Sequence, residues 1–481
     1  MRKFIGRKKE LAAIEQLRRK SSSSLMVLRG RRRIGKSRLL KEYGKQNDLV
    51  FFSGIPPSKK TTAQSQRNEF MRQMSEQFSV PRLFYDDWGD IFWQLGQLIN
   101  EKKIAVVMDE ISWIGSKDPS FLGKLKNAWD LHFSPNPKLL MVLCGSISSW
   151  IDKNILSSTG FLGRVSLSMM LEELPIKDAV KFWGRKLKNQ SSSEVFKILS
   201  VCGGVPKYLE EILPELPADE NIRRLCFVKE GLLYREFDQI FSDLFDKKHE
   251  NYKKVVLSLS NGPKSLDGIC EFLKVRKSSY ISQMLGDLIQ AGFVRKDPTW
   301  NIKTGATSNL VKFRISDNYI RFYLRYIFPN ISKIEAGLFE KKKLSSLPEW
   351  STIMGYQFEN LVLSNKFQIC EILGISPSEI SSIGPFFQKK TLRTRGCQVD
   401  LLIQAKQILY VCEVKFSQNR ISKPILEEMS EKIERISIPF GYSIHPVLIH
   451  TGVVDLDVEE GDFFDKIIDF SDLYLNHLGD E

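Results

Sequence analysis

An eight-residue run near the start of the chain carries the residue types that bind phosphate. It reads G-R-R-R-I-G-K-S from Gly30 to Ser37 and matches the pattern G-x-x-x-x-G-K-S. The two glycines let successive backbone N–H groups turn toward phosphate oxygens. Lys36 supplies a cation for those oxygens, and the Ser37 hydroxyl supplies a ligand for Mg²⁺. We therefore predict a nucleotide site formed by Gly30, Arg31, Arg32, Arg33, Ile34, Gly35, Lys36, Ser37 and Arg38.

Two adjacent carboxylates, Asp109 and Glu110, close the apolar run that begins at Ile104. Such a run is typical of a central parallel strand that is buried on both faces. Ligands bind beyond the carboxyl ends of strands of this kind. We expect Asp109 to bind Mg²⁺, directly or through water, and Glu110 to polarise the attacking water as a general base.

Two further residues are candidates for the same reaction. Ser146 ends an apolar run that begins at Lys138. A side chain at this place would contact a terminal phosphate or the attacking water, and a plain serine at a strand end is the alternative. Arg164 follows a loop rich in serine and glycine. It is a candidate for stabilising charge in the transition state, in cis or from a neighbouring subunit, and a solvated surface arginine is the alternative.

A second group of charged residues lies in the C-terminal part. Asp400 stands inside the apolar strand pattern of 398–403, and Glu413 and Lys415 stand inside that of 408–415. Residues two apart project from the same face of a strand, so Glu413 and Lys415 point the same way and Asp400 can converge on them. The spacing itself is common, but an unpaired charge inside an apolar strand is costly. Two carboxylates and a lysine suit an Mg²⁺ site that activates water.

Hydrophobic patterns indicate the elements that position these residues. Residues 24–29 are typical of a buried strand, residues 37–43 of a helix, and residues 172–245 of a series of helices. Residues 250–316 indicate three helices and a strand pair, a winged helix whose third helix would contact DNA; a scaffold between two domains is the alternative. We predict an α/β protein with a P-loop sheet (1–171), a helical lid (172–248), a winged helix (249–318) and a small α/β domain (319–481).

Composition narrows the functional classes. The chain has 481 residues, of which 27% are charged, and a net charge of +14, which favours a polyanionic partner but also suits a membrane surface. No apolar run is long enough to span a bilayer, and the charged start is unlike a signal peptide. The seven cysteines form no CxxC pair. They indicate reduced thiols, and we expect a cytoplasmic protein.

The motifs of the N-terminal half resemble those of the archaeal-type ATPases, which belong to the AAA+/STAND part of the P-loop class. The resemblance implies ATP as the nucleotide, Mg²⁺ as the metal and a helical lid. The serine after the P-loop lysine replaces a threonine that many relatives have, and it supplies the same hydroxyl. The boxes that carry the resemblance are Phe4–Leu11, Gly30–Ser37, Met108–Glu110, Leu143–Ser146, Gly163-Arg164 and Gly203–Leu209.

The C-terminal pattern is similar to that of the PD-(D/E)XK, or restriction-endonuclease-like, superfamily. The resemblance implies Glu359, Asp400 and Glu413 as metal ligands and Glu413 and Lys415 as catalytic residues. The proline of the name is absent before Asp400. Just upstream, Arg393 and Arg395 are candidates for holding DNA phosphates.

Three hypotheses follow. The leading one is an ATPase that controls a DNA-binding, Mg²⁺-dependent nuclease domain, with ATP and DNA as partners and no membrane insertion. The second is a STAND-type signalling switch, in which ATP changes the assembly state and the C-terminal domain only binds a partner or DNA. The third is a membrane-surface or protein-remodelling ATPase. A homo-oligomer is compatible with all three.

Overall fold

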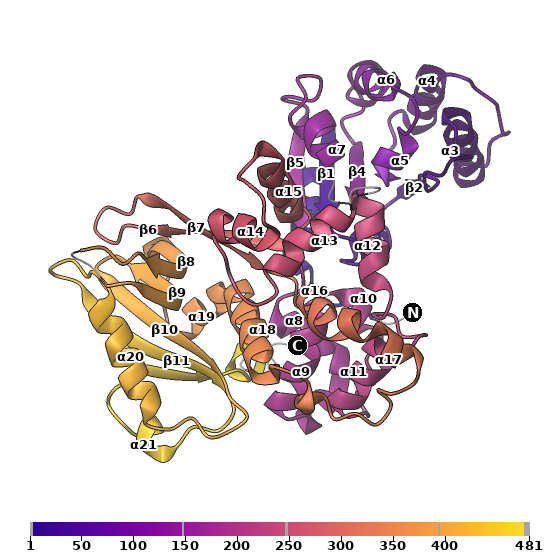
Figure 1. Ribbon diagram of the computed structural model, residues 1–481. Helices are drawn as coiled ribbons and strands as arrows, with labels where there is room; N and C mark the ends of the chain where they lie inside the picture. The colour runs from indigo at the N-terminus through magenta and orange to yellow at the C-terminus, as the bar shows by residue number, and fades with distance from the viewer. Residues whose placement is uncertain (1–2, 147–148, 246–248, 393–394, 476–481) are drawn as a thin grey trace. The chain divides into compact units, whose positions relative to one another are not determined.

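A computed structural model of the chain describes residues 3–146, 149–245, 249–392 and 395–475 (Figure 1). It divides into two units, Met1–Glu173 and Leu174–Glu481. The domain bounds expected at 171, 248 and 318 stay predictions.

The first unit is built on a five-stranded parallel sheet of order β2-β3-β4-β1-β5. Its strands are β1 (Ser24–Gly30), β2 (Leu49–Ser53), β3 (Ala105–Asp109), β4 (Leu140–Ser146) and β5 (Val165–Leu171). Its helices are α1 (Lys8–Arg18), α2 (Lys36–Tyr43), α3 (Ala63–Phe78), α4 (Trp88–Ile99), α5 (Ile111–Ile114), α6 (Phe121–Ala128) and α7 (Ser149–Ile151).

Both faces of this sheet are buried, as the continuous apolar runs predict. Leu25 and Val27 of β1 face the core built with α3, α4 and α6. The alternate residues Met26 and Leu28 face a second core, built with α1 and α2. Because helices cover both faces, ligands reach the sheet at its edges, and the carboxyl edge is where the P-loop lies.

The second unit begins with helices that surround the Gly203-Gly204 pair. Gly203 ends α9 (Ser192–Cys202) with φ 55°, a conformation that favours glycine. A side chain on Gly204 would collide with the Leu174 carbonyl oxygen, at 2.0 Å. The other helices of this segment are α8 (Ile176–Ala179), α10 (Pro206–Leu209), α11 (Ala218–Cys226) and α12 (Glu236–Phe245).

Three helices and a strand pair follow, as the winged-helix prediction requires. They are α13 (His249–Ser258), α14 (Leu266–Leu273), α15 (Ser279–Gln290), β6 (Val294–Trp300) and β7 (Thr307–Ile315). Ser278 caps α15 by accepting from the Ile281 N–H. The wing is not a free hairpin, however. Trp300 packs into the core of the C-terminal sheet, and its Nε1 donates to Gln404 Oε1 at 2.8 Å.

A second sheet, of order β12-β11-β10-β9-β8, forms the C-terminal part. The pairs β8–β9 and β9–β10 are antiparallel, and β10–β11 and β11–β12 are parallel. Helix α20 lies along this sheet (Figure 1) and buries Ile425 and Met429 in its core. The elements are α16 (Asn318–Phe322), α17 (Ile331–Glu335), α18 (Trp350–Ser364), α19 (Lys366–Ile372), β8 (Ile380–Gln388), β9 (Cys397–Ala405), β10 (Ile408–Phe416), α20 (Pro424–Arg435), β11 (Ser443–Thr451), α21 (Leu456–Glu459), β12 (Lys466–Asp469) and α22 (Asp472–Leu475).

The predicted fold class is therefore confirmed: a parallel five-stranded sheet and a separate C-terminal α/β sheet in one mixed α/β chain. All seven cysteines are free, and six of them are buried. Among the helices of the described residues, none combines the length and the apolar character that crossing a bilayer requires.

Candidate functional site

The phosphate-binding loop joins the end of β1 to the start of α2, as predicted. A Cβ at Gly30 would lie 2.8 Å from the Leu171 carbonyl oxygen, so only glycine fits there without a shift. Gly35 has φ 93°, in the region that favours glycine. The Lys36 ammonium is buried and donates to the carbonyl oxygens of Gly30, at 2.8 Å, and Arg31, at 3.2 Å. The lysine thus bends back over the loop whose N–H groups would receive phosphate.

The loop meets the carboxylate strand through one hydrogen bond. The Ser37 hydroxyl donates to Asp109 Oδ2 at 2.7 Å, and the Asp109 side chain is almost wholly buried. A hydroxyl and a carboxylate at this separation are oxygen ligands of the kind that Mg²⁺ prefers. A second carboxylate is not required, because nucleotide phosphates complete the coordination shell of the ion. These two residues therefore fit a nucleotide-bound Mg²⁺.

Glu110 and Ser146, on adjacent strand ends, come together at the same edge. The Ser146 hydroxyl lies 3.3 Å from Glu110 Oε1, and the Ser146 N–H donates to Glu110 Oε2 at 3.4 Å. Glu110 has φ 52°, a left-handed conformation that is costly for a residue with a side chain. This turn directs the carboxylate of Glu110 toward Ser146 rather than along the strand.

Arg7 is a residue of this site that the sequence did not single out. Its guanidinium is buried and donates to the Glu172 carbonyl oxygen at 2.6 Å and to the Ile34 carbonyl oxygen at 3.3 Å. It thereby ties the N-terminal segment to the P-loop and to the residue after β5. Only the family box Phe4–Leu11 had pointed to the region of Arg7.

Two arginines of the P-loop contact residues beside it. Arg31 pairs with Glu173 at 3.2 Å, and Arg32 lies over the Trp113 ring at 5.8 Å.

Arg164 does not reach this site within one chain. It directly precedes Val165, which pairs with Leu25 at the opposite end of β1 from the P-loop. Five residues of strand separate the two ends, or roughly 17 Å. The guanidinium is instead held by Asp130, with contacts of 2.7 and 2.9 Å. Of the two alternatives for Arg164, this geometry disfavours a role in cis, and a role in a neighbouring subunit stays a prediction.

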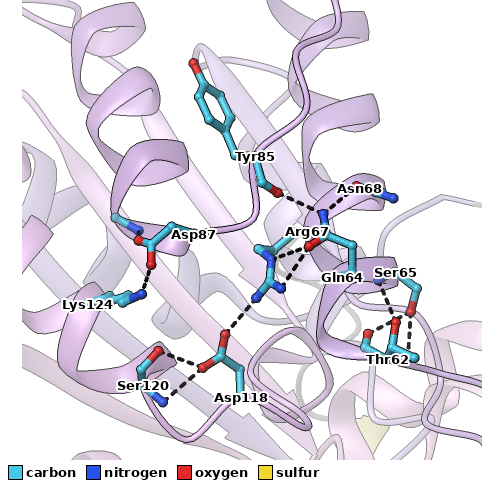
Figure 2. A network of polar contacts seen from close by, with 11 residues as sticks. Thr62, Gln64, Ser65, Arg67, Asn68, Tyr85, Asp87, Asp118, Ser120 and Lys124 are labelled. Atoms are coloured by element: carbon cyan, nitrogen blue, oxygen red, sulfur yellow. Dashed lines mark hydrogen bonds and ion pairs between the residues drawn. The ribbon is translucent and has the colours of Figure 1, made fainter.

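A polar network fixes the segments beside this edge of the sheet (Figure 2). Arg67 of α3 donates to Asp118, which follows α5, at 2.8 Å, and also to Gln64. Gln64 in turn donates to the Tyr85 carbonyl oxygen at 2.8 Å. Because α5 begins right after Glu110, the Arg67–Asp118 pair anchors the chain that leaves the predicted general base.

The C-terminal strands bring Asp400 and Glu413 together, and a lysine lies between them. The Val414 N–H donates to Asp400 Oδ2 at 3.1 Å. The Lys432 ammonium, from α20, is bonded to Glu413 and lies 4.0 Å from Asp400 Oδ2. Burial raises the pKa of Asp400, and Lys432 opposes that rise. Burial, and then Asp400, raise the pKa of Glu413 to about 7.

Glu359 of α18 lies close enough to Asp400 and Glu413 for their charges to act on it. Burial, and then Asp400, raise the pKa of Glu359 to about 8, although Arg321 opposes the rise. Within the described ranges, however, no three His, Cys, Asp or Glu side chains are arranged as one metal-binding group. The expectation that Glu359, Asp400 and Glu413 form a three-carboxylate ligand set is thus not met. Asp400 and Glu413 alone still fit Mg²⁺, which is bound through one or two carboxylates and several waters.

The lysine that contacts the strand acids is not the one that the sequence predicts. Lys415 donates to Glu428 at 2.8 Å and is partly exposed, whereas Lys432 contacts both strand acids. Lys432 was missed because its helix lies outside the E-x-K motif. Arg393 lies outside the described residues, and Arg395 is exposed at the end of the β8–β9 hairpin.

Comparisons with known proteins agree with the first half of this description. Residues 4–212 match a family described as an ATPase domain found predominantly in Archaea. A Walker-type ATPase of Pyrococcus abyssi has a similar structure, with a TM-score of 0.50 and 16% identity over 67% of this chain and 96% of that one. These findings support a P-loop ATPase fold for residues 4–212, and they support nucleotide binding there.

The rest of the chain has relatives without an assigned activity. Residues 323–432 match a family of archaeal and bacterial proteins of unknown function. An uncharacterized protein of Methanocaldococcus jannaschii is 24% identical over 444 residues, which cover 90% of this chain and 93% of that protein. The combination of ATPase domain and C-terminal part thus recurs in a second chain of similar length.

Proposed function

We propose that this chain couples ATP hydrolysis to a C-terminal domain that binds DNA and cuts it with Mg²⁺. The ATPase half rests on the family match and on the P-loop geometry. The nuclease half rests on one observation, the pair of buried strand acids Asp400 and Glu413 on adjacent antiparallel strands beside a lysine. Buried carboxylates whose pKa values are raised by desolvation cluster at functional sites.

In the ATPase domain, we assign each step to a side chain. Lys36 would contact the β- and γ-phosphates in place of the loop carbonyls, and Ser37 and Asp109 would hold Mg²⁺. Glu110 accepts the proton of the attacking water, and Ser146 orients that water or the terminal phosphate. Mg²⁺ neutralises charge on the phosphates when it is bound.

In the C-terminal domain, Asp400 and Glu413 are the proposed ligands of a second Mg²⁺. Such an ion would polarise a phosphodiester and lower the pKa of a bound water. The buried acids carry charge at low cost only when a cation is near, so a divalent ion suits them. Glu359, from α18, lies near these two acids, and burial, followed by Asp400, raises its pKa to about 8, so it favours the protonated form at neutral pH.

Basic side chains near the acids support DNA as the substrate. Lys390 and Arg395 are exposed at the β8–β9 hairpin, and Arg435 is exposed at the end of α20. Gln388 donates to the carbonyl oxygens of Arg395 and Arg435, at 2.6 and 2.7 Å, so these two arginines lie side by side. These basic residues and the net charge of +14 favour a polyanionic ligand, although Arg435 is also paired with Glu431.

The test is cleavage of duplex and single-stranded DNA by the full-length chain in Mg²⁺. We expect Asp400→Asn and Glu413→Gln to lower the rate at least about 100-fold, because each removes a proposed ligand. Glu434→Gln is the matched control, since Glu434 is an exposed acid on α20. A wild-type rate no higher than that of Asp400→Asn would refute the nuclease proposal.

A specific observation favours the second candidate, a nucleotide-controlled switch without cleavage. Lys432 already neutralises Asp400 and Glu413, so the pair is satisfied without a metal. That candidate predicts ATP-dependent oligomerisation, slow hydrolysis and no metal at Asp400. Calorimetric titration with Mn²⁺ separates the two, because only the nuclease proposal expects binding that Asp400→Asn abolishes.

A further inference from the structure

Lysine placement at the carboxylate site departs from the E-x-K motif. Lys415 shares a strand face with Glu413, yet its ammonium is engaged by Glu428 of α20. Both members of that pair are well exposed, with 38% and 51% of their side chains accessible. An ion pair of this exposure contributes little to stability and is screened by salt. The ion-pair partner of Lys415 is thus Glu428 rather than either strand acid.

Lys432 has the opposite environment. It bonds to Glu413, whose side chain is 7% exposed, and lies 4.0 Å from Asp400 Oδ2, whose side chain is 12% exposed. Its own side chain keeps 26% exposure, so the ammonium can reach a ligand at the surface.

The packing of helix α20 on the sheet holds Lys432 in place. Met429, three residues earlier, is fully buried in the sheet core, as is Ile425. The Cys397 thiol of β9 lies 3.5 Å from the Lys432 carbonyl oxygen. Residues three apart share a helix face, so the contacts that bury Met429 also direct Lys432 toward β9 and β10.

We infer that Lys432, and not Lys415, is the lysine that serves the Asp400–Glu413 site. In the absence of metal, its ammonium neutralises both carboxylates and competes with a divalent cation for them. When a cation binds, the ammonium turns to the neighbouring solvent-exposed side, where it binds a phosphate oxygen of the nucleic acid. The competition rests on the proposed metal site at Asp400 and Glu413, and the phosphate contact rests in addition on the proposed nuclease function.

Calorimetric titration of the full-length chain with Mn²⁺ tests the competition. We expect Lys432→Met and Lys432→Gln to bind Mn²⁺ about tenfold or more tightly than wild type, since the competing charge is gone. Lys415→Met is the matched control and keeps the wild-type affinity. Circular dichroism and melting curves establish that each variant is folded, and Lys432→Arg, which keeps the charge, restores weak binding.

DNA cleavage at saturating Mn²⁺ tests the phosphate contact separately. We expect Lys432→Met to lose about 100-fold or more in rate, while Lys415→Met stays within a few fold of wild type. If no variant and no wild-type protein cleaves, the proposed nuclease function fails, and the titration still decides the competition. The inference is overturned if Lys415→Met shows both effects, or if Lys432→Met binds Mn²⁺ as wild type does.

Discussion

Replacing Gly30 by alanine tests how tightly the P-loop is built into its sheet. The added Cβ would lie 2.8 Å from the Leu171 carbonyl oxygen, 3.0 Å from Ile34 Cγ2 and 3.1 Å from Leu171 Cβ. The first contact is with backbone, which cannot rotate away. Overpacking of this kind costs about 1–3 kcal/mol. For a unit of this size that is a fall of about 2–12 °C in melting temperature.

The assay is thermal melting of the full-length chain, read by a probe of the N-terminal unit, with and without ATP and Mg²⁺. The matched control is Gly123→Ala on α6, where a Cβ would meet nothing within 4 Å. Alanine is the better helix former, so this control should raise the stability by about 0.5–1 kcal/mol. We also expect Gly30→Ala to weaken ATP binding, because β1 and the loop must shift together. The reasoning is refuted if Gly30→Ala has the melting temperature of the wild type and keeps its affinity for ATP.

Three further predictions concern the rest of the chain. Because the pKa of Glu359 rises from 4.5 unfolded to about 8 folded, the free energy of unfolding should fall as pH rises through that window, and Glu359→Gln should reduce this slope in pH-dependent denaturation. Trp300→Ala should destabilise the second unit by about 3–5 kcal/mol in denaturant unfolding, since the ring fills the sheet core and bonds Gln404; an unchanged midpoint would contradict the packing of the wing. Glu110→Gln should lower the ATP hydrolysis rate about 10²–10⁴-fold in a steady-state assay while leaving ATP affinity unchanged, and a wild-type rate would exclude Glu110 as general base.

Local sequence signals predicted the elements whose structure depends on local chemistry. The glycines and the lysine of the P-loop and the carboxylates at the end of β3 are all short-range patterns. Each depends on backbone conformations or on burial that a few neighbouring residues determine. The fold class and the place of the P-loop between β1 and α2 therefore followed from the sequence.

Residues whose role depends on distant parts of the chain were missed or misplaced. Lys432 reaches Glu413 only because α20 packs on the sheet, which no spacing in the sequence reveals. Arg164 follows a plausible loop, but the parallel register of β5 with β1 carries it to the far edge. The strand pair of the winged helix was predicted, but no local pattern shows that Trp300 packs into the second core.

Buried polar contacts give a related lesson for Arg321. Arg321 belongs to α16, in a segment rich in aromatic residues, of which Tyr319 and Tyr323 are fully buried. Arg321 is buried with them and donates to Gln357 Oε1 and the Ile315 carbonyl oxygen, both at 3.1 Å. Which partners satisfy a buried arginine depends on tertiary packing, so hydrophobic periodicity could predict its burial but not its bonds.

The most direct test of the account is the effect of ATP on DNA cleavage by the full-length chain. The rate in Mg²⁺ is measured with and without ATP for wild type and for Lys36→Ala, whose P-loop lacks its phosphate contact. Coupled sites typically change each other's function by about 5–150-fold. We predict a change in that range for wild type and none for Lys36→Ala. Equal wild-type rates with and without ATP, or the same response in Lys36→Ala, would contradict the account.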